Sequence, residues 1–130
     1  MVGNSSVVVN NCNVTGSSYN AFQFRTLQNI YLTVSNSIFT DMSTYIIYYY
    51  GWKNTNQSSS TTSITFNGCD FTRTGLIIYL DEYSNQVHLR VYNCTFQHMM
   101  NSAIVIGNGK EENSNIGTIE IVGNDGGAIS

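Results

Sequence analysis

Residues of only two types interrupt the strand pattern of this chain five times. Apolar residues follow the two-residue period of a β-strand before each interruption and again after it, but the phase changes by one residue in between. The interrupting residues are Asn11, Asn36, Gly68, Asn93 and Gly123. Asn and Gly are the types that most readily adopt positive φ, so we predict a single left-handed residue that turns the chain at each position.

The residues after these turns align as an internal repeat. The aligned column contains Cys12, Ser37, Cys69, Cys94 and Asn124, separated by 25, 32, 25 and 30 residues. Five residues earlier, the aligned residues are Val7, Leu32, Ile64, Leu89 and Ile119. The pairs AF, II, IY and AI at 21–22, 46–47, 78–79 and 103–104 mark a further apolar segment. Each repeat therefore predicts three short strands at fixed offsets.

Three strands in each 25-residue repeat, with tight Asn or Gly turns, predict an all-β fold, a parallel β-helix of about five coils. We expect residues 1–130 to form one such segment, with Cys12, Ser37, Cys69 and Cys94 in an inward column. A hairpin turn in a β-sandwich is the alternative, but it would not repeat the same apolar columns. Neither end of the chain carries the polar cap that a solenoid needs, so we expect a segment of a larger surface protein or a unit that stacks on its own copies.

The pattern resembles the right-handed β-helix of the pectin-lyase-like superfamily, including its asparagine ladder at the tight turn. The final residues, NDGGAIS at 124–130, resemble the GGA-I repeat of chlamydial polymorphic outer-membrane proteins and related adhesins, and NSAI at 101–104 is a weaker copy. The companion F-x-x-N motif keeps its Phe but loses its Asn in FTDM, FTRT and FQHM. The resemblance implies a fold that carries lyases, hydrolases, adhesins and inert fibres alike.

Composition narrows the classes of partner. Charged residues make up 10% of the chain, its net charge is −3, and its five Lys and Arg residues are scattered. Nucleic acids and anionic membranes need clustered cations, so we expect neither as a partner. No apolar run approaches the roughly 18 residues of a membrane span. We expect an extracellular or cell-surface location.

The cysteine spacing predicts free thiols rather than a metal site. Cys12 lies two repeats from Cys69, about 9.6 Å away at the usual strand spacing, which is too far for a disulfide. Cys69 and Cys94 are on neighbouring repeats, where a bond is permissible, but the geometry of stacked parallel strands favours a free pair. No C-x-x-C motif occurs and His88 and His98 share no ligand cluster, so we expect no metal and no cofactor.

One set of polar residues is a candidate for chemistry. Asp41, Arg73 and His98 all lie four residues after the aligned column, on successive repeats. They form either an acid/base or anion-binding cluster or, the interpretation that we favour, a charge-compensated stack at a turn. The acidic residues are otherwise dispersed, and no motif of a polysaccharide lyase or hydrolase appears.

Two further features concern carbohydrate. In YIIYYYGW at 45–52, the rings of Tyr48, Tyr50 and Trp52 are candidates for sugar stacking, or they pack beneath the long loop that follows. Sequons occur at four asparagines. Asn4, Asn13 and Asn56 are the glycosylation candidates, whereas a glycan on Asn93 would crowd the turn.

Three functions remain open. The first is a non-catalytic structural or adhesive surface module that stacks end to end on itself or on neighbouring coils of a longer chain. The second is a polysaccharide lyase, hydrolase or binding relative that uses the Tyr48 strand and the Asp41–Arg73–His98 set. The third is an ice- or mineral-binding array on the Thr15, Thr40 and Thr72 column, which Gln97 interrupts. We expect no enzyme activity.

Overall fold

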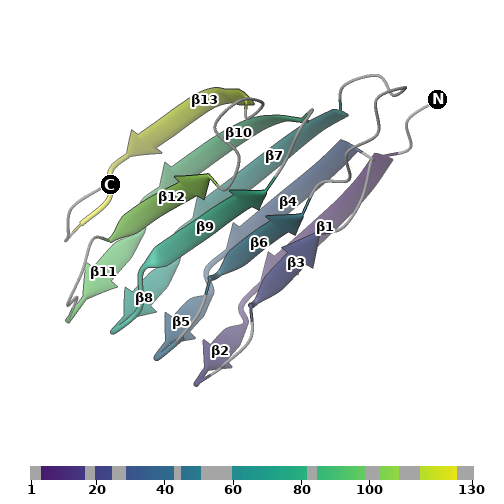
Figure 1. Cartoon of the computed structure of the whole chain (residues 1–130). Coiled ribbons are helices and arrows are strands. Elements are labelled where there is room, and N and C mark those ends of the chain that lie inside the picture. The colour runs from purple at the N-terminus through teal and green to yellow at the C-terminus, as the bar shows by residue number, and fades with distance from the viewer. Residues whose placement is uncertain are drawn as a thin grey trace.

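The computed structural model describes residues 4–16, 20–24, 29–42, 45–50, 60–81, 85–98, 103–108 and 115–125. Every regular element in these ranges is a β-strand, and every strand pair is parallel (Figure 1). The predicted all-β class with parallel strands is confirmed.

The strands form three sheets, each built from every third strand along the chain. Sheet A contains, in spatial order, β1 (Asn4–Asn10), β4 (Asn29–Ser35), β7 (Ser60–Asn67), β10 (Asn85–Tyr92) and β13 (Asn115–Val122). Sheet B contains β2 (Asn13–Thr15), β5 (Ile38–Thr40), β8 (Asp70–Thr72) and β11 (Thr95–Gln97). Sheet C contains β3 (Phe22–Phe24), β6 (Ile47–Tyr50), β9 (Leu76–Asp81) and β12 (Ile104–Asn108). We call each run of three consecutive strands a row: β1–β3 is row 1, β4–β6 row 2, β7–β9 row 3 and β10–β12 row 4, and β13 begins row 5.

The register of sheet A agrees with the repeat found in the sequence. Val7 pairs with Leu32, Leu32 with Ile64, Ile64 with Leu89 and Leu89 with Ile119. These partners are 25, 32, 25 and 30 residues apart, which are the intervals of the aligned column. The apolar column expected five residues before the aligned column is therefore confirmed.

The register of sheet C corrects the sequence alignment in two places. The alignment matched 46–47 with 78–79, but Ile47 pairs with Ile78. It also matched 78–79 with 103–104, but Leu76 pairs with Ile104 and Ile78 with Ile106. The cause lies in the turn before these strands: row 3 runs from Arg73 to β9 through only Thr74 and Gly75, whereas row 4 takes three more residues to reach β12. The number of residues before sheet C therefore differs between rows, whereas sheet B keeps a regular register.

The three sheets share one hydrophobic core, to which alternate residues of each strand contribute. In β4, for example, Ile30, Leu32 and Val34 are buried and Tyr31 is exposed. Rings from sheet B stack through the middle of this core, with Phe39 and Phe71 centroids 5.2 Å apart and Phe71 and Phe96 centroids 4.9 Å apart. The stacked column is the direct result of placing Phe at one offset in successive repeats.

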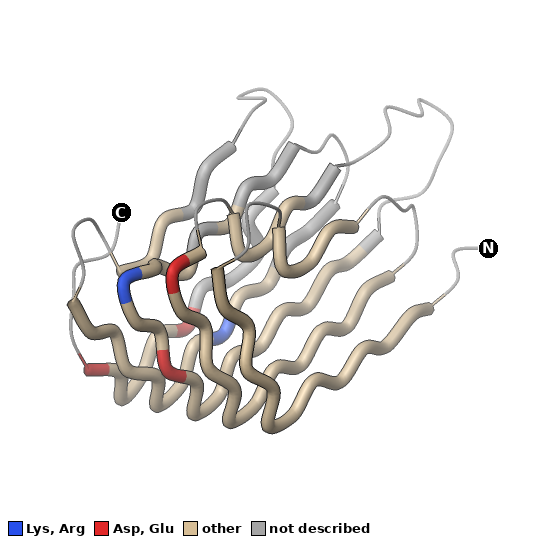
Figure 2. The backbone as a smooth tube through the Cα atoms, turned by 90° about the horizontal axis from the view of Figure 1, so that it is seen from below, with Lys and Arg blue, Asp and Glu red and all other residues tan. Residues whose placement is uncertain are grey.

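Row 1 is much less buried than the rows that follow it. The Val7 side chain is 39% exposed, whereas its column partners Leu32 and Ile64 are 1% and 0% exposed. The reason is that β1, β2 and β3 each lie at the end of their sheet, so each pairs with a strand on one side only. No residue before Arg25 is charged, and the backbone of row 1 is accordingly drawn without blue or red in Figure 2.

Candidate functional site

The corner between sheets A and B is formed by Asn11, Asn36, Gly68, Asn93 and Gly123, which we call the first corner. All five have positive φ, between 51° and 69°. Each of the first four backbone N–H groups donates to the carbonyl of the next row, as in the bond of 3.0 Å from Asn36 N to Asn67 O. The residues that the sequence identified as left-handed turns therefore stack along one line.

At the first corner, the asparagine side chains occupy space that the glycines of the following rows leave free. A Cβ on Gly68 would lie 2.8 Å from Oδ1 of Asn36, and one on Gly123 would lie 2.6 Å from Oδ1 of Asn93. These separations are too short for real carbon atoms, so each glycine leaves room for the asparagine of the row before it. Asn36 also donates through Nδ2 to Oδ1 of Asn10 at 3.4 Å.

The column of Cys12, Ser37, Cys69 and Cys94 lies one residue further along. Ser37, Cys69 and Cys94 are fully buried, but Cys12 is exposed, which corrects its expected burial because row 1 has no neighbour on its outer side. Ser37 accepts a hydrogen bond from the Cys12 N–H at 3.1 Å and donates one to Ser35 O at 2.9 Å. Asn124 likewise accepts from the Cys94 N–H at 2.8 Å.

All three cysteines are free thiols. Cys94 lies one row after Cys69, and its interaction with the Cys69 thiol together with burial raises the pKa of Cys94. Its S–H donates to Tyr92 O at 3.3 Å. A buried thiol held in its protonated form is a small hydrophobic core residue rather than a nucleophile.

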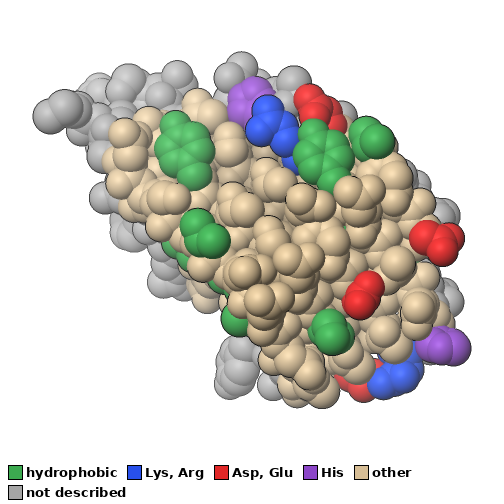
Figure 3. Space-filling model, turned by 180° about the vertical axis from the view of Figure 1, so that it is seen from behind, with side chains coloured by type: hydrophobic (Ala, Val, Ile, Leu, Met, Phe, Trp, Pro, Cys, Tyr) green, Lys and Arg blue, Asp and Glu red, His purple; other side chains and the backbone are tan. Residues whose placement is uncertain are grey.

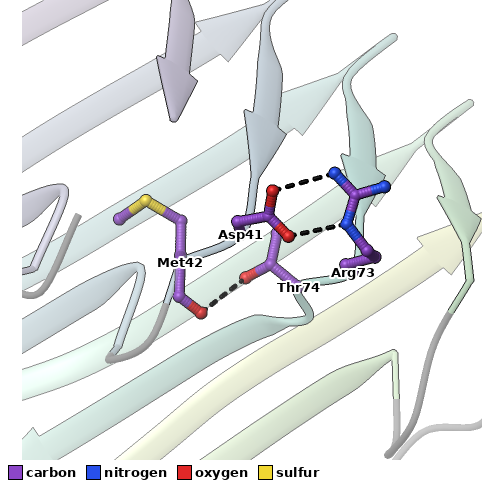
Figure 4. Close-up of polar contacts among 4 residues, drawn as sticks. All are labelled: Asp41, Met42, Arg73 and Thr74. Carbon is purple, nitrogen blue, oxygen red and sulfur yellow. Dashed lines mark hydrogen bonds and ion pairs between the residues drawn. The ribbon is translucent and has the colours of Figure 1, made fainter. Parts of the chain in front are cut away.

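Asp41 and Arg73 form a bidentate ion pair at the corner between sheets B and C (Figure 4). Arg73 donates from Nε to Asp41 Oδ1 at 2.7 Å and from Nη2 to Oδ2 at 2.8 Å. The Arg73 hydrogen bond lowers the pKa of Asp41, and the same bond raises the pKa of Arg73. Beside the pair, Thr74 Oγ1 donates to Met42 O at 3.4 Å.

His98 occupies the next row at the same offset and is exposed. The backbone links the rows, because Arg73 N donates to Gln97 O at 3.0 Å. In the described residues, however, no hydrogen bond or ion pair joins the side chains of Arg73 and His98. Two of the three candidate residues therefore contact one another through their side chains.

Asp41, Arg73 and His98 share a backbone feature that sequence reasoning missed. With Gly16 they have positive φ, between 52° and 63°, and these four residues form what we call the second corner. The signal was present in the sequence, because Gly16 lies at the same offset and Asp and His are among the types that adopt this conformation. Arg is not, so Arg73 holds an unusual conformation at an exposed position.

Two of the three aromatic candidates lie on sheet C. Tyr48 is half-buried on β6, next to the fully buried Ile47, and its ring centroid is 5.8 Å from that of Tyr45. Tyr50 ends the same strand. Trp52 lies outside the described residues, so the structure leaves its predicted role open.

Two glycosylation candidates are exposed strand residues. Asn4 begins β1, and its Oδ1 accepts from Asn29 Nδ2 at 2.8 Å. Asn13 begins β2 and accepts at 3.2 Å from the hydroxyl of Thr15, the third residue of its own sequon. Asn56 lies outside the described residues.

Neither metal ligands nor membrane-spanning helices are found in the described part of the chain. No three His, Cys, Asp or Glu side chains gather there in a group that could hold a metal ion. No helix long and apolar enough to cross a membrane occurs there either.

Comparison of the chain with known proteins found no match. No protein-family model matches the chain, and no curated protein or solved structure matches it. The function must therefore be argued from the geometry alone.

Proposed function

We propose that this chain is a non-catalytic structural module, a right-handed parallel β-helix of about five coils, that stacks end to end on a second copy of itself. The exposed core-facing side of row 1 is the observation that carries the proposal. Val7 occupies a column that is buried in rows 2, 3 and 4, yet 39% of its own side chain is exposed. A further row laid against β1 would bury this column and extend it.

The backbone edge of row 1 favours the same partner. A terminal strand presents unpaired N–H and C=O groups, and proteins usually protect such a strand with charge or proline. This chain contains no proline, and no charged residue precedes Arg25. The edge of row 1 therefore has neither a charged residue nor a proline to protect it, and it is suited to parallel pairing with another strand.

A second copy supplies a matching surface from its row 5. Ile121 of β13 packs against the core and occupies the same sequence column as Val9 of β1. Stacking row 5 of one copy on row 1 of the next would continue the apolar columns of sheet A. A head-to-tail contact of this kind does not close on itself and generates filaments.

The location that we propose is the cell surface or the extracellular space. Exposed sequons at Asn4 and Asn13 and a polar surface with few charges support it. The adhesive role and the superfamily resemblance rest on the repeat pattern in the sequence.

Sedimentation velocity over a range of protein concentrations tests the stacking, with electron microscopy of the largest species. We expect association that Val7→Lys abolishes, because this change places a charge on the core-facing side of the edge. Val8→Lys is the matched control, since Val8 is the next residue and is 72% exposed on the opposite side of the strand. A wild-type chain that stays monomeric throughout, or equal loss in both variants, would contradict the proposal.

The alternative that we retain is a polysaccharide-binding or polysaccharide-degrading protein. The charged pair of Asp41 and Arg73 at a strained, exposed corner and the Tyr45–Tyr48 ring pair support it. Incubation with polyuronides and neutral glycans, assayed for new reducing ends or unsaturated products, tests it. Product formation that Arg73→Ala abolishes would favour this alternative over the structural module.

A further inference from the structure

We propose that the outer face of sheet A binds an uncharged polysaccharide chain, laid across the strands between Tyr31 and Tyr92. Neither tyrosine belongs to the aromatic segment at 45–52, whose strand β6 is part of sheet C. The inference is independent of end-to-end stacking, because stacking uses the strand edge of row 1 and leaves this face open. The argument starts from the register of three neighbouring strands.

The register places the two tyrosines at opposite corners of one patch. Tyr31 pairs with Ser63, which pairs with His88, and four residues further along β10 comes Tyr92, which pairs with Asn67. Tyr31 and Tyr92 are therefore separated by two strand spacings and four residues. At the usual dimensions of a sheet this corresponds to about 16 Å, a span long enough for a few sugar rings.

Short uncharged side chains of β4 and β7 form most of the floor between these rings, and β10 adds His88 and Arg90. Thr33 pairs with Thr65 and Ser35 with Asn67, so hydroxyl and amide groups of neighbouring strands lie side by side. The three hydroxyl residues are half-buried and Asn67 is exposed. The face seen in Figure 3 is mostly tan, with isolated large hydrophobic side chains on it and a group of basic, acidic and His side chains along its upper part.

Both tyrosine rings are available to a ligand. Tyr31 is 43% exposed. Tyr92 is partly exposed, and its hydroxyl donates to Glu120 Oε2, a bond that raises the pKa of Tyr92 and anchors its ring at the edge of the patch. Arg90 lies within the patch as the partner of Thr65, and its Nε is 3.6 Å from Glu120 Oε2, so these two charges compensate one another.

The chemistry of this face matches a neutral sugar chain. The negative face of an aromatic ring attracts the weakly positive C–H groups of a pyranose. Replacing an aromatic side chain that stacks on a nucleobase weakens binding roughly tenfold or more, and a stacked sugar ring uses the same kind of contact. Hydroxyl and amide groups exchange hydrogen bonds with sugar hydroxyls without the cost of desolvating a charge. A nucleic acid would instead need several unpaired cations, and Arg90 is already paired with Glu120.

Isothermal titration of the whole chain with hexasaccharides of β-1,4-glucose, β-1,4-xylose and β-1,4-mannose tests the proposal, with a hexagalacturonate as the charged probe. We expect at least one neutral hexasaccharide to bind more tightly than the hexagalacturonate. Tyr31→Ala and Tyr92→Ala should each weaken that binding about tenfold. Tyr92→Phe keeps the ring and loses only the bond to Glu120, so its loss should be smaller.

Ile38→Ala is the control, because it removes an exposed apolar side chain from β5 of sheet B and should leave the affinity unchanged. Tyr48→Ala tests the other candidate sugar site, on sheet C. Circular dichroism confirms that each variant folds, and sedimentation should show the same association state as the wild type. Three results would overturn the proposal: no binding of any neutral probe, full affinity in Tyr31→Ala, or loss of binding in Tyr48→Ala alone. Thermal hysteresis without sugar binding would also overturn it, since that result would assign the hydroxyl floor to ice.

Discussion

The first and second corners share a left-handed backbone conformation but differ in the residue types that adopt it. At the first corner, every residue with positive φ is Asn or Gly, whereas the second corner holds Gly16, Asp41, Arg73 and His98. The difference lies in what surrounds the side chains. A Cβ at Gly68 would meet Asn36 at 2.8 Å, but a Cβ at Gly16 would meet nothing within 4 Å. Contact with the asparagine of the row before restricts the residue type at Gly68 and Gly123, whereas open space surrounds Gly16 of row 1.

The second corner is therefore where unusual residues can persist. Arg73 and Asp41 are 53% and 46% exposed, so their side chains meet solvent and one another rather than a packed neighbour. A left-handed conformation costs an L-residue about 1–2 kcal/mol. Asp41, Arg73 and His98 adopt this conformation in three successive rows, which places three polar, exposed side chains along one line.

The largest expected effect separates the two corners directly. Gly68→Ala should lower the free energy of unfolding by about 2–3 kcal/mol, because it adds the left-handed strain to a clash with Asn36. Gly16→Ala has the strain without the clash and should cost about 1 kcal/mol. Urea denaturation followed by circular dichroism measures both values.

A double mutant shows whether the clash accounts for the difference. In an Asn36→Gly background, the cost of Gly68→Ala should fall to that of Gly16→Ala, because the atom nearest the new Cβ is gone. Equal costs for Gly68→Ala and Gly16→Ala in the wild-type background would show that packing does not distinguish the corners.

An intermediate effect is expected from relieving strain at the second corner. His98→Gly should raise the free energy of unfolding by about 0.5 kcal/mol, since glycine adopts positive φ without steric cost but loses more chain entropy on folding. Gln97→Gly is the control. Gln97 ends β11, just before the corner, and glycine in a strand lowers the free energy of unfolding. A destabilised His98→Gly would indicate that the imidazole makes contacts that outweigh the strain.

The smallest expected effect is the pH dependence of the ion pair. The hydrogen bond from Arg73 lowers the pKa of Asp41, so the ionised carboxylate stabilises the fold above about pH 4, and this contribution is lost as the pH falls through the lowered pKa. The stability difference between wild type and Asp41→Asn should be largest near pH 7 and shrink towards zero in acid. Thermal denaturation across pH measures it, and added salt should also reduce it, because both groups are exposed. A difference that grows in acid would contradict the assigned role of Arg73.

The sequence predicted the register of sheet A correctly and that of sheet C less well. Strands of sheet A are seven or eight residues long, so each contributes several apolar residues to the two-residue pattern, and the spacing of Leu32, Ile64 and Leu89 identified their partners. Strands of sheet C follow a turn whose length varies. Only the structure shows that Leu76 pairs with Ile104.

The candidate site was only half visible in the sequence. The spacing in the sequence placed Asp41, Arg73 and His98 in one column. Side-chain orientation decides that Arg73 makes two hydrogen bonds to Asp41, and the sequence does not specify that orientation. The pattern also gave no reason to select Tyr31 and Tyr92. They fall in different columns, and only the lateral pairing of β4, β7 and β10 brings them onto one patch.

The amino-acid sequence alone determined where the backbone turns left-handed and which apolar residues pair across sheet A, because both depend on residue type at a repeated spacing. The tertiary structure decided which of those turns tolerate a side chain, which charged groups meet, and which row leaves its core-facing side exposed. These outcomes depend on what the neighbouring row places opposite each residue, and a linear pattern does not specify that neighbour's orientation. Val7 illustrates the division: its column marks it as a core residue, and only the position of β1 at the end of sheet A leaves it 39% exposed.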